Sequence, residues 1–135
     1  MLEQEITSPP TATTIQTRVR YAECDPMNVA HHAVYPIWLE MARTELLRQQ
    51  GMVYRELEAR GILFVVVRMS LSYRRPALYD DVLDIHVEAL PAKGVKVEHR
   101  YEVRRDGELL GTAETTLACV NREGRPQPLP EELRG

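Results

Sequence analysis

The sequence predicts an α+β domain in which one antiparallel sheet wraps around a single long helix. Three observations lead to this fold class. The chain has 135 residues, of which 44% are hydrophobic and 27% charged, a size and composition typical of one globular domain. One long segment is apolar over most of a helical circumference. Four segments with the two-residue period of strands then follow without an intervening helix.

We expect the domain to cover residues 15–125, with a tail at each end. Residues 1–14 contain acidic side chains and no apolar run, so they predict neither a core element nor a secretion signal. Residues 126–135 are rich in proline, which cannot extend a central strand. The longest apolar run, 62–67, is far shorter than the ~20 residues of a membrane span.

The first strand is expected from Ile15, because apolar and polar side chains alternate as far as Tyr21. Ile15, Thr17, Val19 and Tyr21 fall on one face of this strand. Pro26 ends the pattern, since proline cannot donate a ladder hydrogen bond. The two cysteines, Cys24 and Cys119, are too far apart in sequence for a disulfide framework or a metal-binding spacing, and we expect both to be free in a reducing cytoplasm.

The long helix is expected over 34–50. Pro36 suits its first turn, and Gly51 suits its end, where the backbone often takes a positive φ. Because its apolar positions cover well over half of the circumference, this helix should be buried on several sides. A short helix is expected over 53–60, between Gly51 and Gly61.

The remaining strands are expected over 62–73, 82–89, 95–105 and 108–120. Asp106-Gly107 is a hairpin signal, and such short connections favour antiparallel pairing. A sheet and one very apolar helix bury their apolar faces best when the sheet curls around the helix. Leu110 and Val120 are expected on the other face of the sheet, where they would meet a second subunit of a homodimer or homotetramer.

The net charge of −3 and the pI of about 5.8 exclude a nucleic-acid binder held by a basic face. The chain has only two lysines, Lys93 and Lys96, against a background of arginines.

Polar residues with catalytic chemistry gather between Tyr21 and Tyr35, in the segment YAECDPMNVAHHAVY. Asp25 lies in a turn, where an Asx turn that satisfies backbone N–H groups is one interpretation. The other is a catalytic carboxylate, because the start of the long helix follows closely. The free N–H groups and positive dipole end of a helix can stabilise an oxyanion.

No metal site is expected in this segment. His31 and His32 are adjacent, so on a helix they point about 100° apart, and no HExxH motif or cysteine pair accompanies them. Cys24 is rejected as a nucleophile because Glu23 and Asp25 flank it, and their negative charges oppose a thiolate.

The segment resembles the 4-hydroxybenzoyl-CoA-thioesterase-like branch of the hotdog-fold superfamily, especially the bacterial acyl-CoA thioesterases associated with the Tol–Pal system. The residues that carry the resemblance are Tyr21, Glu23, Asp25, His32, Tyr35, Trp38, Glu40, Ala42 and Arg43. It continues through FVVVRMSLSYRRPALYDDVLDI and GTAETTLACVN, and covers about residues 16–121. Asn28 stands where many members have glycine, but asparagine tolerates a left-handed turn.

The resemblance implies a hotdog fold and hydrolysis of an acyl-CoA thioester without a metal or cofactor. It makes Asp25 the nucleophile or the general base, and the backbone N–H of His32 the oxyanion donor. Tyr35 and His31 are then candidate substrate contacts. A thioester carbonyl is already electrophilic, so a carboxylate and a helix end suffice in principle.

The phosphates of CoA require cations near the site. The resemblance places basic residues for the nucleotide near Lys93 and Lys96, in the turn between two strands, and Arg74 and Arg75 are further candidates. The alternative is that all four are solvated turn charges.

Two other functions stay open on the sequence alone. One is a hotdog-fold hydratase or dehydratase, and the other is a non-catalytic acyl-CoA-binding module. The sequence leaves open the acyl group, the choice between CoA and an acyl carrier protein, and the choice between dimer and tetramer.

Overall fold

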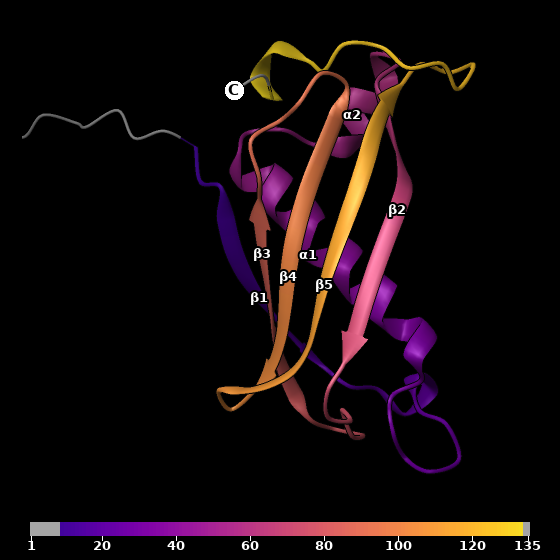
Figure 1. The fold of residues 1–135 in the computed structure, drawn as a ribbon, viewed down its shortest axis with the longest axis vertical. Helices are drawn as coiled ribbons and strands as arrows, with labels where there is room; N and C mark the ends of the chain where they lie inside the picture. Colours follow the sequence, from indigo (N-terminus) through magenta and orange to yellow (C-terminus); the bar gives the residue numbers. More distant parts are fainter. Residues whose placement is uncertain (1–8, 134–135) are drawn as a thin grey trace, which may run out of the picture.

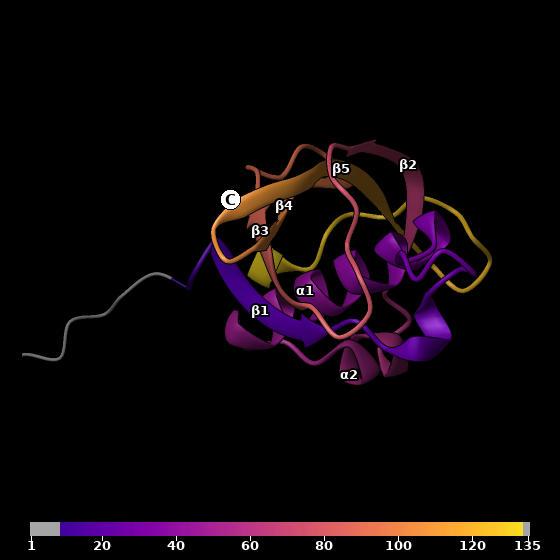
Figure 2. The ribbon, with the colours of Figure 1, turned by 90° about the horizontal axis from the view of Figure 1, so that it is seen from below.

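In the computed structural model, which describes residues 9–133, a curved five-stranded sheet encloses one long helix (Figures 1 and 2). The strands are β1 (Ala12–Arg18), β2 (Leu63–Tyr73), β3 (Val82–Ala89), β4 (Lys96–Arg105) and β5 (Glu108–Val120). Their order in the sheet is β1-β3-β4-β5-β2, and every neighbouring pair is antiparallel. The predicted α+β hotdog architecture is confirmed.

The long helix α1 (Tyr35–Gln49) and the short helix α2 (Tyr54–Ala59) form where the sequence predicts them. Pro36 lies in the first turn of α1, and Gly51 follows its end with φ of +88°. The helix packs on β1 and β3 and buries four side chains completely or nearly so, namely Trp38, Leu39, Ala42 and Leu46. Across from them the sheet contributes Leu83, Ile85, Val87, Tyr101 and Val103.

One side of α1 stays uncovered by its own chain. Ile37 is 51% exposed, and Met41 is also exposed. The sequence predicts a helix buried on several sides, and within the described residues this face is the exception.

Leu110 and Val120 do not face outward as predicted. Both are buried within the chain. At the β4–β5 pair, Arg104 is opposite Leu109 and Val103 is opposite Gly111, so Leu110 is an extra residue in a bulge, and it joins the core. Val120 forms a bridge with Pro126, in the chain's own C-terminal segment. The expected contact of these two residues with a second subunit is therefore wrong.

The ends of the chain are ordered further than the strand pattern indicates. β1 begins at Ala12, three residues before the expected start at Ile15, and residues 1–8 lie outside the described residues. Near the other end, Leu129 is buried and Glu131–Leu133 form a 3-10 turn. Tyr21, predicted on the inner face of the first strand, is instead 76% exposed, because the strand ends at Arg18 and a 3-10 turn follows.

Candidate active site

The predicted catalytic segment is a closed loop at one end of the sheet, just before α1 (Figure 1). Its two sides are joined by a bridge between Cys24 and Ala30 and by a 2.8 Å hydrogen bond from His31 N to Glu23 O. Asn28 turns the chain with φ of +67°, as expected for an asparagine in the place of a glycine. The loop thereby delivers the chain directly to the start of the helical segment.

Asp25 is half-buried at the base of this loop. Its Oδ1 accepts hydrogen bonds from Met27 N at 2.8 Å and from Val29 N at 3.3 Å. This is the Asx turn that the sequence allowed. Among residues 9–133, Oδ2 accepts no hydrogen bond, so the turn occupies one carboxylate oxygen and leaves the other for a reaction.

A 3-10 turn, His32–Val34, leads into α1. His31 caps it, since its Nδ1 accepts from Ala33 N at 3.1 Å. Val34 N donates to His31 O, whereas the N–H of His32 has no hydrogen bond within the described chain. Tyr73 fixes this turn from the end of β2, because its hydroxyl donates to His32 O at 3.0 Å. The free N–H therefore belongs to a held piece of backbone at a helix start.

Glu23 is a buried carboxylate that fixes the loop to α1. Its Oε1 accepts from Arg20 N at 2.8 Å, and its Oε2 accepts from the Arg20 guanidinium at 3.1 Å and from Trp38 Nε1 at 3.3 Å. Burial favours a higher pKa for Glu23. The hydrogen bonds and charge of Arg20 and the bond from Trp38 outweigh it, and the pKa lies below its ordinary value. The sequence pattern includes Glu23 but does not reveal this anchoring role.

Tyr35 lies beneath the loop rather than on its surface. It is 4% exposed and packs against Trp38 and Tyr73, each with ring centroids 4.9 Å away. Burial, and then the neighbouring Tyr73, raise its pKa. Nearby, Gly111 allows β5 to approach β2 closely, because a Cβ there would lie 2.9 Å from Ser72 O, whereas at 3.9 Å it would only touch the Tyr35 ring. The structure therefore gives Tyr35 a packing role within this chain, and its contact with substrate stays a prediction.

The other polar groups of the loop have local roles. The rings of His31 and His32 stack with centroids 4.3 Å apart, and both side chains are exposed. No three possible metal ligands of the His, Cys, Asp or Glu type gather anywhere in residues 9–133. Burial, followed by the charges of Asp25 and Glu23, raises the pKa of the Cys24 thiol, which agrees with its rejection as a nucleophile.

The four basic candidates lie at opposite ends of the molecule. Arg74 and Arg75 directly follow Tyr73 at the loop end, and Arg75 Nε pairs with Glu108 at 3.1 Å. Lys93 and Lys96 form a bridged turn between β3 and β4, at the other end of the sheet (Figure 1). The eight residues of β3 separate this turn from the Asp25 loop, a distance of roughly 25 Å. One chain therefore does not bring its lysines to its own Asp25.

Comparisons with known proteins find relatives of this chain in both sequence and fold. The profile of the "Thioesterase-like superfamily" matches residues 19–135. The chain is 34% identical over 118 residues to the acyl-CoA thioester hydrolase YbgC of Escherichia coli, covering 86% of this chain and 88% of that one.

Two solved structures are also similar. A probable thioesterase from Bartonella henselae superposes with a TM-score of 0.84 at 31% identity, covering 88% of this chain and 99% of that chain. The hypothetical protein TT1821 from Thermus thermophilus superposes with a TM-score of 0.84 at 35% identity, covering 90% and 92%. Within the described residues, no helix is both long and apolar enough to cross a membrane.

Proposed function

Since the chain belongs to the thioesterase-like superfamily and is a thioester hydrolase, we propose that it cleaves acyl-CoA to a free acid and CoA at the Asp25 loop. The observation that carries this proposal is the pair of unused groups at the loop, Asp25 Oδ2 and the N–H of His32. One is a carboxylate oxygen able to attack or to accept a proton. The other is a hydrogen-bond donor at a helix start, of the kind that stabilises an oxyanion.

In the proposed reaction, the thioester carbonyl oxygen accepts the N–H of His32 while its carbon faces Asp25. The carboxylate acts in one of two ways. As a general base it takes a proton from water, and the hydroxide adds to the carbonyl carbon. As a nucleophile it forms an acyl anhydride that water then hydrolyses. On either route the C–S bond breaks, the CoA thiolate leaves and is protonated, and one water is consumed. Detection of an acyl adduct on Asp25 by rapid-quench mass spectrometry distinguishes the second route from the first.

The decisive experiment compares thiol release from a panel of acyl-CoA thioesters by the wild type and by Asp25→Asn. The matched control is Asp106→Asn, in the exposed β4–β5 turn, where φ of +49° suits asparagine. We expect Asp25→Asn to lower kcat by at least about 100-fold, the usual weight of a general base, and Asp106→Asn to leave it unchanged. A wild type inert on every chain length would favour a binding module. A wild type that instead hydrates enoyl-CoA would favour a hydratase.

We further propose that the enzyme is a homodimer joined through β2. This 11-residue strand lies at the edge of the sheet, and its exposed side chains include Val65, Val67 and Met69. Ile37 and Met41 of α1 are further exposed apolar side chains. A long, apolar, unprotected edge favours pairing with another strand. A second copy of β2 supplies such a strand when a two-fold axis makes the pair antiparallel.

This dimer gives the two lysines a role. Lys96 pairs with Ala118 on β5, and Ala118 pairs with Val65 on β2. Antiparallel pairing of β2 with its copy places the Val65 end of one strand beside the Tyr73 end of the other. Lys93 and Lys96 then serve the CoA phosphates at the partner's catalytic loop, and Arg74 and Arg75 serve them from the same chain. Phosphates favour such cations.

We place the reaction in the reducing cytoplasm, the compartment expected from the sequence. Cys24 and Cys119, both free in the structure, support that placement.

A further inference from the structure

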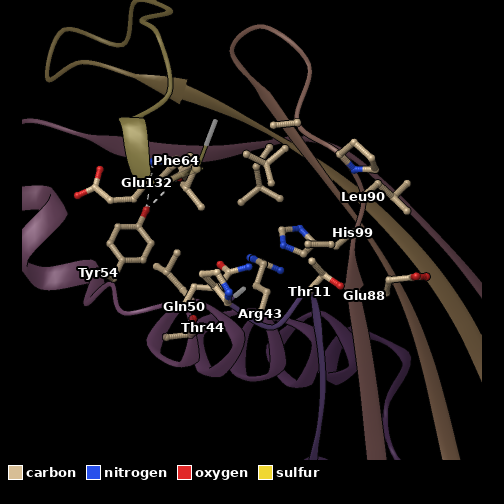
Figure 3. A pocket seen from close by; sticks show the side chains of 18 residues that line it. Thr11, Arg43, Thr44, Gln50, Tyr54, Phe64, Glu88, Leu90, His99 and Glu132 are labelled. Atoms are coloured by element: carbon tan, nitrogen blue, oxygen red, sulfur yellow. Dashed lines mark hydrogen bonds between the residues drawn. The ribbon is translucent and has the colours of Figure 1, made fainter. Parts of the chain in front are cut away.

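A cavity of about 770 Å³ lies at the end of the molecule opposite the Asp25 loop. It opens between the second half of α1, the inner face of the sheet and the C-terminal 3-10 turn (Figure 3). Its volume is within the range of small-molecule binding sites. The proposed hydrolysis uses no residue that lines it.

The walls of the cavity are mainly apolar. Leu47 comes from α1, Phe64 from β2 and Leu117 from β5, and Leu90, Val97 and Leu133 complete the lining. Tyr54 stands at one side, but its hydroxyl is engaged with the backbone N–H and carbonyl of Phe64, at 3.2 and 3.1 Å. Such walls suit a ligand with a compact apolar body.

His99, on β4, is a buried polar side chain at the cavity wall that lacks a partner. It is 9% exposed, and its Nδ1 is the one buried side-chain nitrogen or oxygen among residues 9–133 without a hydrogen bond. Figure 3 shows its imidazole facing the cavity beside the guanidinium of Arg43. Burial, and then the charge of Arg43, lower the pKa of His99 to about 4, so the ring is neutral at pH 7. Nδ1 has almost no accessible surface, so the ring nitrogen that a ligand can reach is Nε2, which also has no hydrogen bond within the described residues.

Arg43 brings a positive charge into the same cavity without a close anion. Its side chain is only 15% exposed. Its contacts are long, at 3.5 Å from Nη1 to Tyr101 Oη and 4.0 Å from Nη2 to Glu40. Tyr101 Oη is already held by Thr115 Oγ1 at 2.6 Å. A largely dehydrated guanidinium favours a carboxylate that it can bind with two hydrogen bonds.

The acidic residues at the rim do not supply that carboxylate. Glu132 pairs with Arg60 at 3.2 Å, on the outside of the cavity. Glu88 is exposed, and it also borders a separate groove. Figure 3 shows its carboxylate pointing away from Arg43, which is the one arginine or lysine among the described residues that line the cavity.

We propose that this cavity is a binding site for a small monocarboxylic acid with an apolar body. The carboxylate pairs with Arg43 and takes a hydrogen bond from the imidazole of His99, while the body fills the space between α1 and the sheet. Acids are also the compounds that thioester hydrolysis releases, but the site stands on its own residues and does not depend on the Asp25 reaction.

The test is titration of the full-length protein with benzoate, followed by calorimetry and by amide NMR shifts. We expect saturable binding with one site per chain, and shifts at Thr44, Val97 and Leu117. Benzamide, which has the same shape without the charge, should bind at least about tenfold more weakly, the factor that 1.4 kcal/mol represents. This comparison needs no variant, so it holds even if a substitution impairs folding.

The variants sharpen the assignment. Arg43→Met should weaken benzoate binding at least tenfold, whereas Arg48→Met should not change it, because Arg48 is exposed on the same helix. Asp25→Asn should bind benzoate as the wild type does. The proposal is overturned by the lack of saturable binding, by equal affinity for benzamide, by binding insensitive to Arg43→Met, or by shifts confined to residues 24–31. Binding that persists in a protein without thioesterase activity would refute the proposed function alone.

Discussion

Protonation of His99 is expected to destabilise the folded protein. The ring is buried, and the charge of Arg43 opposes a second positive charge beside it, so the folded pKa is about 4 against an ordinary value of 6.5. Between these pH values the unfolded chain binds a proton that the folded chain does not. Stability therefore rises with pH across this window, is complete above about pH 6.5, and is lost as the pH falls toward 4.

The size of the effect follows from the shift. A difference of about 2.5 pKa units corresponds to roughly 3 kcal/mol of unfolding free energy, since one unit is worth about 1.4 kcal/mol. The other polar groups near the His99 ring do not reverse this dependence of stability on pH. Tyr101 and the rim carboxylates Glu88 and Glu132 are present in the wild type and in the variant alike, so their contributions cancel in the comparison.

The assay is urea unfolding at pH values from 7.5 to 4.5, at one fixed protein concentration because oligomerisation shifts apparent stability. We expect the wild type to lose about 2.5 kcal/mol more than His99→Gln across this range, since pH 4.5 is still above the folded pKa of about 4. His86→Gln is the matched control, since His86 lies on the outer face of the sheet and bonds Thr14 Oγ1 at 2.8 Å. Equal losses in the wild type and in His99→Gln would refute the reasoning.

Three further outcomes are expected. His32→Pro removes the proposed oxyanion donor and should lower kcat by about 100- to 1,000-fold, measured by thiol release, whereas His32→Ala keeps the N–H and the activity. Glutamate at Lys93 and Lys96 should raise KM for acyl-CoA while leaving hydrolysis of a short acyl thioester of N-acetylcysteamine nearly unchanged. Val67→Lys, which places a charge on the exposed edge strand, should convert the dimer to a monomer in analytical ultracentrifugation.

Each of these outcomes has a contrary result. Activity retained in a folded His32→Pro variant would remove the N–H from the mechanism. Equal losses on both substrates after reversal of the lysine charges would show that they do not bind the CoA portion. A wild type that sediments as a monomer, or a Val67→Lys variant that stays dimeric, would exclude β2 as the interface.

Periodicity predicted the elements well because each has a simple environment. β3 alternates strictly, since Leu83, Ile85 and Val87 face α1 while the intervening side chains face outward. The helix α1 was recognisable from its apolar surface and from the Pro36 and Gly51 signals at its ends. These are local rules, and tertiary contacts reinforce them here.

The failures occur where one residue changes the register. The sequence places Leu110 on the outer face, but a bulge in β5 turns it into the core. A similar irregularity between Val66 and Arg68 interrupts β2. The alternating pattern does not reveal an extra residue, because the inserted Leu110 follows another leucine and either leucine fits a buried position.

The candidate site likewise contains some residues that the sequence indicates and some contacts that only the structure reveals. Asp25 is a candidate because its loop is followed closely by a helix start, whereas the resemblance supplies the role of the His32 N–H, and both roles remain proposals. The anchoring of Glu23 by Trp38 depends on contact between side chains 15 residues apart. The support of His32 by Tyr73 spans 41 residues. Such pairs are set by the path of the whole chain, so spacing alone does not indicate them.

The position of the lysines links the interface to the chemistry. Within one chain they lie at the end of the sheet away from Asp25, so we propose that they reach the CoA phosphates across a dimer in which β2 pairs antiparallel with its copy. Val67→Lys and the double lysine reversal should therefore produce the same defect, a raised KM for acyl-CoA with hydrolysis of the short thioester preserved. Combining the substitutions should add little, because a monomer has already lost the lysines of its partner. Additive effects would mean that the lysines act within their own chain, and the proposed interface would then have no role in holding CoA.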